Sequence, residues 1–365
     1  MSRYDCTRAE LAELLAGQPA YRVRQLWDGL YRQLAAPEEL TVLPATLRAE
    51  LAARSELAPA LELVTEQLAD DGATAKWLFK LPDGERIETV LMYSERRCSV
   101  CVSSQAGCAM GCSFCATGQA GYRRQLRPGE IVEQVVRAAR AARDAGRRLD
   151  HVVFMGMGEP LANFAAIWRA TEAIVGDLDL AARHVTISTV GVVPGIHRLA
   201  AAPLQVNLAV SLHAANDELR NELVPLNRRY PLAALMAACR DYVEATHRRI
   251  SFEWALIAGV NDRERDAEEL AGLCRAIGAH VNLIPLNPTP GYPVLGSPPT
   301  AVRAFRDALF SLGVNATVRK TRGRDIAAAC GQLAATAVGQ MAAPSRRPVP
   351  RRHREDEGAR RVFPR

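Results

Sequence analysis

The first 58 residues carry apolar side chains at the spacing of short amphipathic helices. Thr7 and Glu10 match a capping-box pattern, in which two side chains satisfy free backbone N–H groups at a helix start, and they predict a helix through residues 11–15. A second helix is predicted from about Arg22, and its apolar stripe is formed by Val23, Leu26, Trp27 and Leu30. We therefore expect a helical unit over residues 1–58.

Residues 59–93 change to the short alternating runs of β-strands. Runs at 73–80 and 86–92 flank the turn sequence Pro82-Asp83-Gly84, and this arrangement predicts a β-hairpin extension. Glu88 interrupts the otherwise apolar second run, which is unusual because carboxylates are rarely buried. The simplest interpretation of Glu88 is a carboxylate on an edge strand that faces water.

From Cys98 onward, predicted strands and helices alternate. The clearest helix spans 128–143, with a continuous apolar face and Glu130 in its first turn. Strand–helix repetition predicts a parallel α/β sheet, whose functional groups gather at the C-terminal ends of its strands. This pattern does not separate a partial barrel from a doubly wound sheet. The predicted strands are 99–103, 151–155, 185–189, 205–212, 250–257, 281–285 and 316–320.

Composition places the chain among globular proteins of more than one structural unit. It has 365 residues, of which 48% are hydrophobic and 24% charged. It lacks an apolar run of the ~18 residues that a membrane span needs. It also lacks an apolar signal core near Met1. Nine cysteines in such a chain argue for a reducing compartment and against a disulfide framework. We expect a cytoplasmic monomer without a membrane partner.

The net charge of +6 lies mostly in the C-terminal tail. Residues 342–365 hold eight Arg and three acidic residues, so the tail carries +5 and the remaining 341 residues about +1. With almost no core-forming residues, residues 341–365 are predicted to be a disordered basic tail. Non-specific attraction to RNA and a dispensable extension are equally compatible with it.

Three thiols lie within one short loop. Cys108, Cys112 and Cys115 form a C-x3-C-x2-C pattern that can hold three irons of a four-iron, four-sulfur cluster and leave the fourth iron open to a small molecule. A structural zinc site or a set of buried thiols is the alternative. Zinc sites usually pair two ligand motifs and no second pair is present, so the cluster is favoured. Phe114 would shield it on one side.

Polar groups also stand where several predicted strands end. Gly158 and Glu159 follow an apolar strand, where a glycine lets a ligand approach the backbone and a carboxylate can hold a cation. Each of these groups alone is also typical of a turn. The others at strand ends are Ser188, Ser211, Leu212, His213 and Asn287.

Two further cysteines have an unusual context. Cys330 lies among small residues after the basic run 319–324, which suits the close approach of a bulky partner. Cys101 lies on a predicted strand three residues after Cys98, so these two side chains point to opposite faces.

The thiol pattern with Phe114 before the last cysteine resembles the signature of radical S-adenosylmethionine (SAM) enzymes. Together with the strings 101–105 and 115–118, the chain resembles the RlmN/Cfr family of RNA adenine methyltransferases from about Tyr21 to Gln340. The resemblance implies an incomplete (β/α)6-type radical SAM barrel over 94–340. It also implies that residues 1–58 form an accessory domain that helps to hold RNA. Arg22, Arg24 and Arg32 are candidates for phosphate contacts, and a solvated helix face is an equally good interpretation of each one.

The resemblance also assigns the cofactors and the site. It implies one [4Fe-4S] cluster and two SAM molecules per turnover. The implied cluster ligands are Cys108, Cys112 and Cys115; the implied SAM contacts are Gly158, Glu159, Ser188, Ser211, Leu212, His213 and Asn287; and the implied catalytic residues are Glu88, Cys101 and Cys330.

The family route explains the two cysteines. C2 of adenine is too electron-poor to attack a sulfonium methyl group, whereas a thiolate is a good nucleophile. By resemblance, the first SAM methylates Cys330, and the second is cleaved to a radical that takes hydrogen from this methyl group. The carbon then joins adenine, and Cys101 releases the product by forming a transient disulfide with Cys330. Glu88 is the implied proton acceptor.

The implied substrate is an adenosine in the peptidyl-transferase region of 23S rRNA, with the adenosine beside the tRNA anticodon as a second candidate. An electron donor such as flavodoxin is the implied partner. Methylation at C8 of the same rRNA adenosine, which gives antibiotic resistance, uses the same cysteines and stays open. A non-enzymatic RNA-binding protein with a metal site and a radical SAM enzyme that acts on protein are weaker alternatives.

Overall fold

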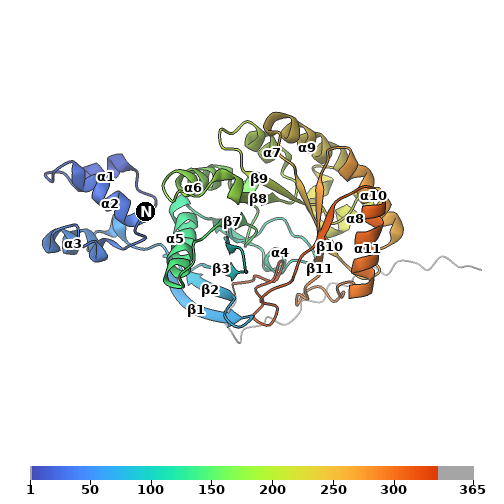
Figure 1. Ribbon diagram of the computed structural model, residues 1–365, viewed down its shortest axis with the longest axis horizontal. Helices are drawn as coiled ribbons and strands as arrows, with labels where there is room; N and C mark the ends of the chain where they lie inside the picture. Colours follow the sequence, from blue (N-terminus) through green and yellow to red (C-terminus); the bar gives the residue numbers. More distant parts are fainter. Residues whose placement is uncertain (1, 336–365) are drawn as a thin grey trace, which may run out of the picture.

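The computed structural model describes residues 2–335 (Figure 1). It contains an N-terminal helical unit, one large sheet and the helices that cover it. The basic tail predicted for 341–365 lies outside the described residues. No helix within residues 2–335 combines the length and apolar character of a membrane span.

The helical unit has the predicted helices. Glu10 N donates to Thr7 Oγ1 at 3.2 Å and Thr7 N donates to Glu10 Oε2 at 2.6 Å, which confirms the capping box. Leu26, Trp27 and Leu30 are buried on the predicted stripe. The elements are α1 (Arg8–Leu14), α2 (Tyr21–Tyr31), α3 (Ala45–Ala52) and the short turns η1 (Pro37–Glu39) and η2 (Ser55–Leu57).

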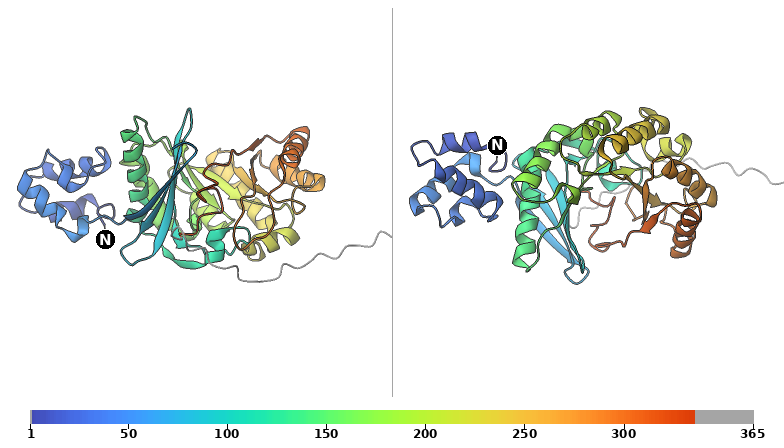
Figure 2. Two further views of the ribbon diagram at one scale, coloured as in Figure 1. Left: turned by 90° about the horizontal axis from the view of Figure 1, so that it is seen from below. Right: turned by 45° about the horizontal axis from the view of Figure 1, so that its top comes forward.

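The helical unit lies beside α5 (Pro128–Asp144), at one end of the molecule (Figures 1 and 2). Polar contacts fix it there: Gly129 N donates to Asp5 Oδ1 at 2.8 Å, and the Trp27 indole donates to Asp177 Oδ1 at 2.8 Å. An ion pair between Arg140 and Glu39 at 2.7 Å adds to them. The unit therefore has a defined position on the outside of the sheet.

The three arginines that are candidates for phosphate contacts have different surroundings. Arg32 pairs with Asp179 at 3.6 Å and Arg22 donates to Gln25 Oε1 at 2.7 Å. Arg24 is exposed, and the ion pairs of residues 2–335 do not include it. Arg24 is thus the most available of the three, and its contact with RNA stays a prediction.

One ten-stranded sheet runs through the molecule in the order β1-β2-β3-β4-β7-β8-β9-β10-β11-β12. Strands β1 to β4 pair antiparallel, and the strands from β4 to β12 pair in parallel. The strands are β1 (Glu62–Ala69), β2 (Thr74–Lys80), β3 (Arg86–Tyr93), β4 (Cys98–Cys101), β7 (His151–Phe154), β8 (Val185–Thr189), β9 (Asn207–Ser211), β10 (Ser251–Leu256), β11 (His280–Pro285) and β12 (Ala316–Val318).

Each predicted strand of the parallel region is present, with both ends within two residues of the prediction. The two edges, β1 and β12, do not pair with each other within the described chain, so the barrel is incomplete. The covering helices are α5, α6 (Phe164–Gly176), α7 (Val193–Ala200), α8 (Asp217–Leu223), α9 (Leu232–Thr246), α10 (Glu264–Arg275) and α11 (Pro299–Ser311), with short turns η3 (Pro160–Asn163), η4 (Ala182–His184) and η5 (Pro225–Arg228).

The hairpin is confirmed as β2 and β3, but it is part of the main sheet. Strand β3 lies between β2 and β4, and Glu88 on it is only 2% exposed. The interpretation of Glu88 as an edge-strand carboxylate is therefore wrong. The alternating pattern did not reveal that β3 also pairs with β4, the strand that connects it to the parallel region. Strand β3 therefore has a neighbour on both sides.

Helix α5 shows why the sequence folds in this way. The side chains of Ile131, Val132 and Val135 are at most 1% exposed and belong to the main hydrophobic core. Burial of each such side chain stabilises the fold by roughly 1.5–3 kcal/mol. The predicted apolar face of α5 thus holds the helix against the sheet.

Candidate active site

A small two-stranded ribbon carries the thiol loop. Strands β5 (Gln105–Gly107) and β6 (Tyr122–Gln125) pair antiparallel, and α4 (Ala116–Ala120) follows the last thiol. Cys108 N donates to Gly121 O at 2.9 Å and closes the base of the loop. Gly107 has φ +73°, and a Cβ there would lie 2.0 Å from Gly121 O, so this closure requires glycine.

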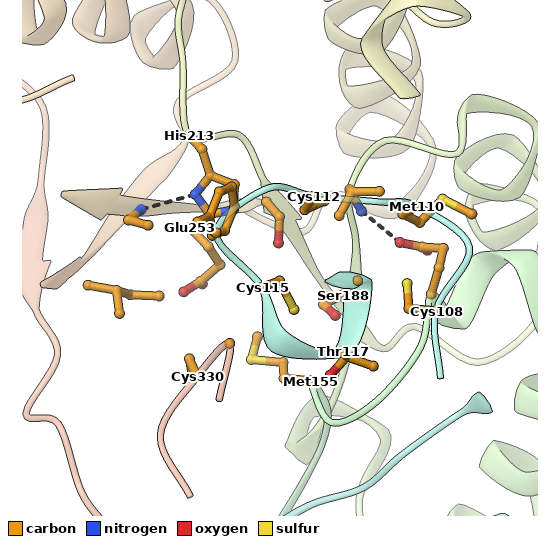
Figure 3. A pocket seen from close by; sticks show the side chains of 18 of the residues that line it. Cys108, Met110, Cys112, Cys115, Thr117, Met155, Ser188, His213, Glu253 and Cys330 are labelled. Atoms are coloured by element: carbon orange, nitrogen blue, oxygen red, sulfur yellow. Dashed lines mark hydrogen bonds between the residues drawn. The ribbon is translucent and has the colours of Figure 1, made fainter. Parts of the chain in front are cut away.

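The three thiols line one cavity at the C-terminal ends of the parallel strands (Figure 3). We call it the first cavity. Burial raises the pKa of Cys108 to about 12 and that of Cys112 well above its ordinary value, and the neighbouring thiols add to both shifts. Within residues 2–335 no three ligating side chains converge as they would on a single metal ion. Three cysteines without a second ligand pair in the sequence suit a cluster, which spreads its thiolates over separate irons, better than a four-ligand zinc site.

Glu159 is the carboxylate expected at the end of β7, and it lies in the first cavity. Its carboxylate accepts hydrogen bonds from Leu161 N at 2.9 Å and from Val190 N at 2.8 Å, and burial raises its pKa to about 7. The ion pairs of the described residues do not include it. A buried carboxylate fixed by backbone donors and without a cation suits a ligand with an ammonium group.

Gly158 brings the backbone close to β5. Its φ is +100°, and a Cβ would lie 2.5 Å from the Gln105 side chain. Glu159 N donates to Gln105 Oε1 at 2.8 Å. A side chain at position 158 would therefore push β7 away from the thiol ribbon.

Ser188 and His213 line the same cavity from the ends of β8 and β9. Ser188 Oγ donates to Phe154 O at 2.6 Å. His213 Nδ1 accepts from Ala255 N at 3.0 Å, and burial lowers the pKa of the ring to about 3, so His213 is neutral with its proton on Nε2. Phe114 packs edge-on against this ring at 4.7 Å, between the thiol loop and β9.

Ser211 and Asn287 line the first cavity as expected, whereas Leu212 does not. Leu212 is 0% exposed in the hydrophobic core and does not line the cavity, because successive strand side chains point to opposite faces. Asn287 does line it, and its buried Oδ1 has no hydrogen-bond partner. An unsatisfied buried acceptor facing a cavity indicates a ligand with a donor group.

Arg220 is a functional residue that the sequence patterns missed. It is 1% exposed and donates to Val190 O at 2.7 Å, Leu212 O at 3.1 Å and Ser211 O at 3.3 Å. These bonds tie the ends of β8 and β9 together. Nothing in the local sequence of α8 distinguishes this arginine from a surface residue.

The segment that carries Cys330 crosses the open side of the thiol loop. Ala116 N donates to Gly331 O at 2.8 Å and Thr117 Oγ1 donates to Leu333 O at 2.5 Å. Asn287 Nδ2 donates to Cys330 O at 3.1 Å. Figure 3 shows Cys330 beside Met155 and Glu253, with Cys115 between Cys330 and Cys108.

A second cavity lies on the other side of Cys330. Cys101 and Cys330 both line it, together with the basic side chains Arg97, Arg319, Lys320 and Arg322. Burial and, to a smaller extent, the charge of the Cys330 thiol raise the pKa of Cys101 to about 12. The wall common to both cavities is formed by Met155, Ile284, Asn287, Arg319 and Cys330. The structure thus brings together the two cysteines that the sequence singled out.

Glu88 lines neither cavity. Its Oε1 pairs with Lys76 Nζ at 2.9 Å, and its Oε2 accepts from Ala334 N at 2.8 Å and Ala335 N at 3.1 Å. It lies on the same face of β3 as Val90, which lines the second cavity. The segment that follows Cys330 therefore covers Glu88.

Glu253 is a second carboxylate in the first cavity, and the sequence could have revealed it. It is 5% exposed on β10 and accepts from Ser251 Oγ at 3.0 Å and Asn282 Nδ2 at 2.7 Å. Burial raises its pKa. A charged residue inside the apolar run 252–257 is the same signal that drew attention to Glu88.

The residues of the first cavity fit an iron–sulfur cluster with an amino-acid ligand. Three free thiols supply the soft donors that iron binds. Glu159 and the unsatisfied Asn287 Oδ1 supply acceptors for a cationic, donor-bearing ligand. All nine cysteines are free thiols, so the transient disulfide expected between Cys101 and Cys330 is not formed in this state.

A family model described as the radical SAM superfamily matches residues 102–271. A probable dual-specificity RNA methyltransferase RlmN from Chloroflexus aurantiacus is 49% identical, over 91% of this chain and 92% of that protein. Dual-specificity RNA methyltransferase RlmN 1 from Myxococcus xanthus is 51% identical, over 91% of this chain and 94% of that protein.

A solved structure gives the same result. The crystal structure of a radical SAM methyltransferase from Sphaerobacter thermophilus is 55% identical to this chain and superposes with a TM-score of 0.89. It covers 92% of this chain, and this chain covers all of it. The similarity therefore includes the helical unit and the sheet together.

Proposed function

Because this chain belongs to the RlmN family of radical SAM RNA methyltransferases, we propose that it methylates C2 of an adenosine in the peptidyl-transferase region of 23S rRNA. We propose the adenosine beside the tRNA anticodon as a second substrate. The observation that carries the proposal is the position of Cys330 on the wall between the two cavities. A methyl group on this sulfur can be received from one side and delivered to the other.

The first cavity serves the cofactors in this proposal. Cys108, Cys112 and Cys115 hold a [4Fe-4S] cluster with one open iron, and Glu159 and Asn287 bind the amino-acid end of SAM. When bound, the cluster and SAM supply the methyl group and the one-electron chemistry that removes a hydrogen atom. A one-electron donor such as flavodoxin is required. Phe114 and the Cys330 segment exclude water from this side.

The second cavity serves the RNA. Its cationic side chains attract phosphate. The Cys330 thiolate takes the methyl group of SAM and becomes a neutral thioether. After this methyl group loses a hydrogen atom, its carbon bonds to C2 of adenine. The adduct then loses one electron, which the cluster would accept, and the C2 proton, which Glu88 accepts. The Cys101 thiolate then attacks the Cys330 sulfur, so that a sulfur–sulfur bond forms and the bond from this sulfur to the new carbon breaks, its electron pair passing to the base.

Glu88 acts as the proton acceptor in the proposal. Its carboxylate is held by Lys76 and covered by residues 334–335. The covering segment must move before adenine reaches the carboxylate. Lys76, which is also buried, places a positive charge beside this carboxylate.

Nucleoside mass spectrometry tests the proposal. The reconstituted protein is incubated without oxygen with 23S RNA, a reductant and methyl-labelled SAM. Labelled 2-methyladenosine is expected. Label at C8 would replace the proposed product with the resistance-type modification, and absence of labelled adenosine despite SAM cleavage would overturn the proposed substrate. A parallel reaction with tRNA tests the second substrate.

A further inference from the structure

Arg319 is the charged side chain of the wall that the two cavities share. The other members of this wall are an apolar group, a thioether, an amide and the thiol of Cys330. Arg319 N donates to Leu283 O at 2.8 Å, one residue beyond β12, and this bond fixes the backbone. Its Nη1 lies 3.9 Å from Met155 Sδ. The guanidinium is therefore held between the first cavity and the second cavity, which contains Cys101.

The guanidinium has no carboxylate partner at ion-pair distance among the described residues. Glu253, whose charge contributes to the environment of Arg319, is already bound by Ser251 and Asn282. The Cys330 thiolate makes the largest contribution to the raised pKa of Arg319, and Cys101 contributes as well. A half-buried cation in this position therefore has Glu253 and the two thiols as its anionic neighbours, and of these only the thiols change charge in the proposed reaction.

The two thiols compete for this cation. Burial and the Cys330 charge raise the pKa of Cys101, and Arg319 lowers it. Methylation turns Cys330 into a neutral thioether, so the repulsion disappears and one partner of Arg319 is lost. The guanidinium then has Cys101 as its remaining thiolate.

We propose that Arg319 is a positioning residue that holds thiolate charge first at Cys330 and then at Cys101, so that methylation of Cys330 activates Cys101. This inference rests on the proposed two-cysteine function. It gives the reaction an order: Cys101 becomes a strong nucleophile only after Cys330 carries its methyl group. Premature attack is avoided because one guanidinium serves one thiolate at a time.

Other charged groups near the two thiols do not fill this role. Tyr93, Arg97, Lys320 and Arg322 line the second cavity alone. Glu159, His213, Glu253 and the three cluster thiols line the first cavity alone. None of them lies on the shared wall.

Alkylation of Cys101 tests the proposal without RNA or turnover. The cluster-loaded protein is treated with limiting iodoacetamide across a pH series, and mass spectrometry follows the initial rate at Cys101. Removal of the competing thiol in Cys330→Ala is expected to raise this rate about tenfold, as a pKa decrease of about one unit would. In an Arg319→Gln background the same removal is expected to raise it less than about threefold, because direct repulsion alone remains.

Further variants complete the experiment. Lys320→Gln removes a cation from the second cavity alone and is expected to leave the Cys101 rate within about twofold. Arg319→Lys retains a charge and is expected to restore part of the coupling. If Arg319→Gln fails to retain iron, Arg319→Met decides the question, because full wild-type coupling without a cation at this position would overturn the proposal.

Equal coupling with and without Arg319 would overturn the proposal. The outcome is separable from that of the proposed function. Normal coupling in a protein that makes no 2-methyladenosine would reject the substrate and leave the role of Arg319 intact, whereas product formation without coupling would reject Arg319 alone.

Discussion

The two cavities on either side of Cys330 have opposite charge. The first contains the carboxylates Glu159 and Glu253, whereas the second contains the cations Arg97, Lys320 and Arg322 and no carboxylate among its lining residues. A sulfonium cofactor with an ammonium group suits the first, and a polyanionic RNA suits the second. The 341 residues before the tail have a net charge of only about +1, yet they can separate two ligands because the charges of opposite sign lie in different cavities.

The largest expected effect concerns the residue between the cavities. Cys330→Ala should lower product formation by on the order of 10⁴-fold or more, because the methyl group loses its acceptor. The first cavity should be unaffected, so iron content and SAM cleavage should remain near wild type. Both are measured on the same preparation. Residual product above this limit would mean that the cavities exchange methyl groups without this sulfur.

Cys101→Ala should leave the RNA attached to the protein. Without the attacking thiolate, the bond between Cys330 and the base is not broken. A denaturing gel with labelled RNA should show a covalent complex that approaches one RNA per protein. Cys98→Ala is the matched control, since Cys98 is on the same strand, β4, and does not line the second cavity; a complex with this variant would contradict the assignment.

Glu159→Gln should weaken the first cavity alone. Loss of the carboxylate removes the partner of the ammonium group, and the KM for SAM should rise about 10–100-fold, as a change of roughly 1.4–3 kcal/mol implies. The Kd for RNA should stay within twofold of wild type, on the order of experimental error. A large decrease in RNA affinity would show that the two cavities are not independent.

Lys320→Gln should weaken the second cavity alone, and by a smaller amount. One exposed phosphate contact is expected to contribute a few-fold in RNA affinity, and the slope of log K against log salt should fall by about one. Lys80→Gln is the matched control, because Lys80 lies on β2 outside both cavities and pairs with Glu62 at 3.4 Å. Equal effects of the two variants on RNA affinity would contradict the assignment of the second cavity as the RNA site.

The sequence predicted the strands and the loop that form the two cavities, but it did not predict which side chains form the wall between the cavities. The strand ends and the thiol loop were accessible because apolar periodicity and cysteine spacing are local signals. The surroundings of Glu88 were not, since the pairing of β3 with β4 and the cover from residues 334–335, far along the chain, are tertiary features. The basic run 319–324 was recognised, but only the sheet shows that Arg319 points to the shared wall.

Glu253 and Arg220 mark two different limits. Glu253 interrupts an apolar strand, so the rule applied to Glu88 would have identified it. Arg220 is buried because the loops after β8 and β9 present free carbonyl groups to it. Such a tertiary acceptor set leaves no trace in the sequence of α8, so this arginine was not predictable.

The hydrogen bond from Ala116 N to Gly331 O joins the thiol loop to the segment that carries Cys330. These two segments come from distant parts of the chain, and Thr117 and Leu333 join them a second time. Under the proposed function, the fold of the thiol loop and the position of the Cys330 sulfur are therefore set together. A distortion of the thiol loop would reach the Cys330 segment through these two hydrogen bonds, so cluster binding and methyl transfer would be expected to fail together.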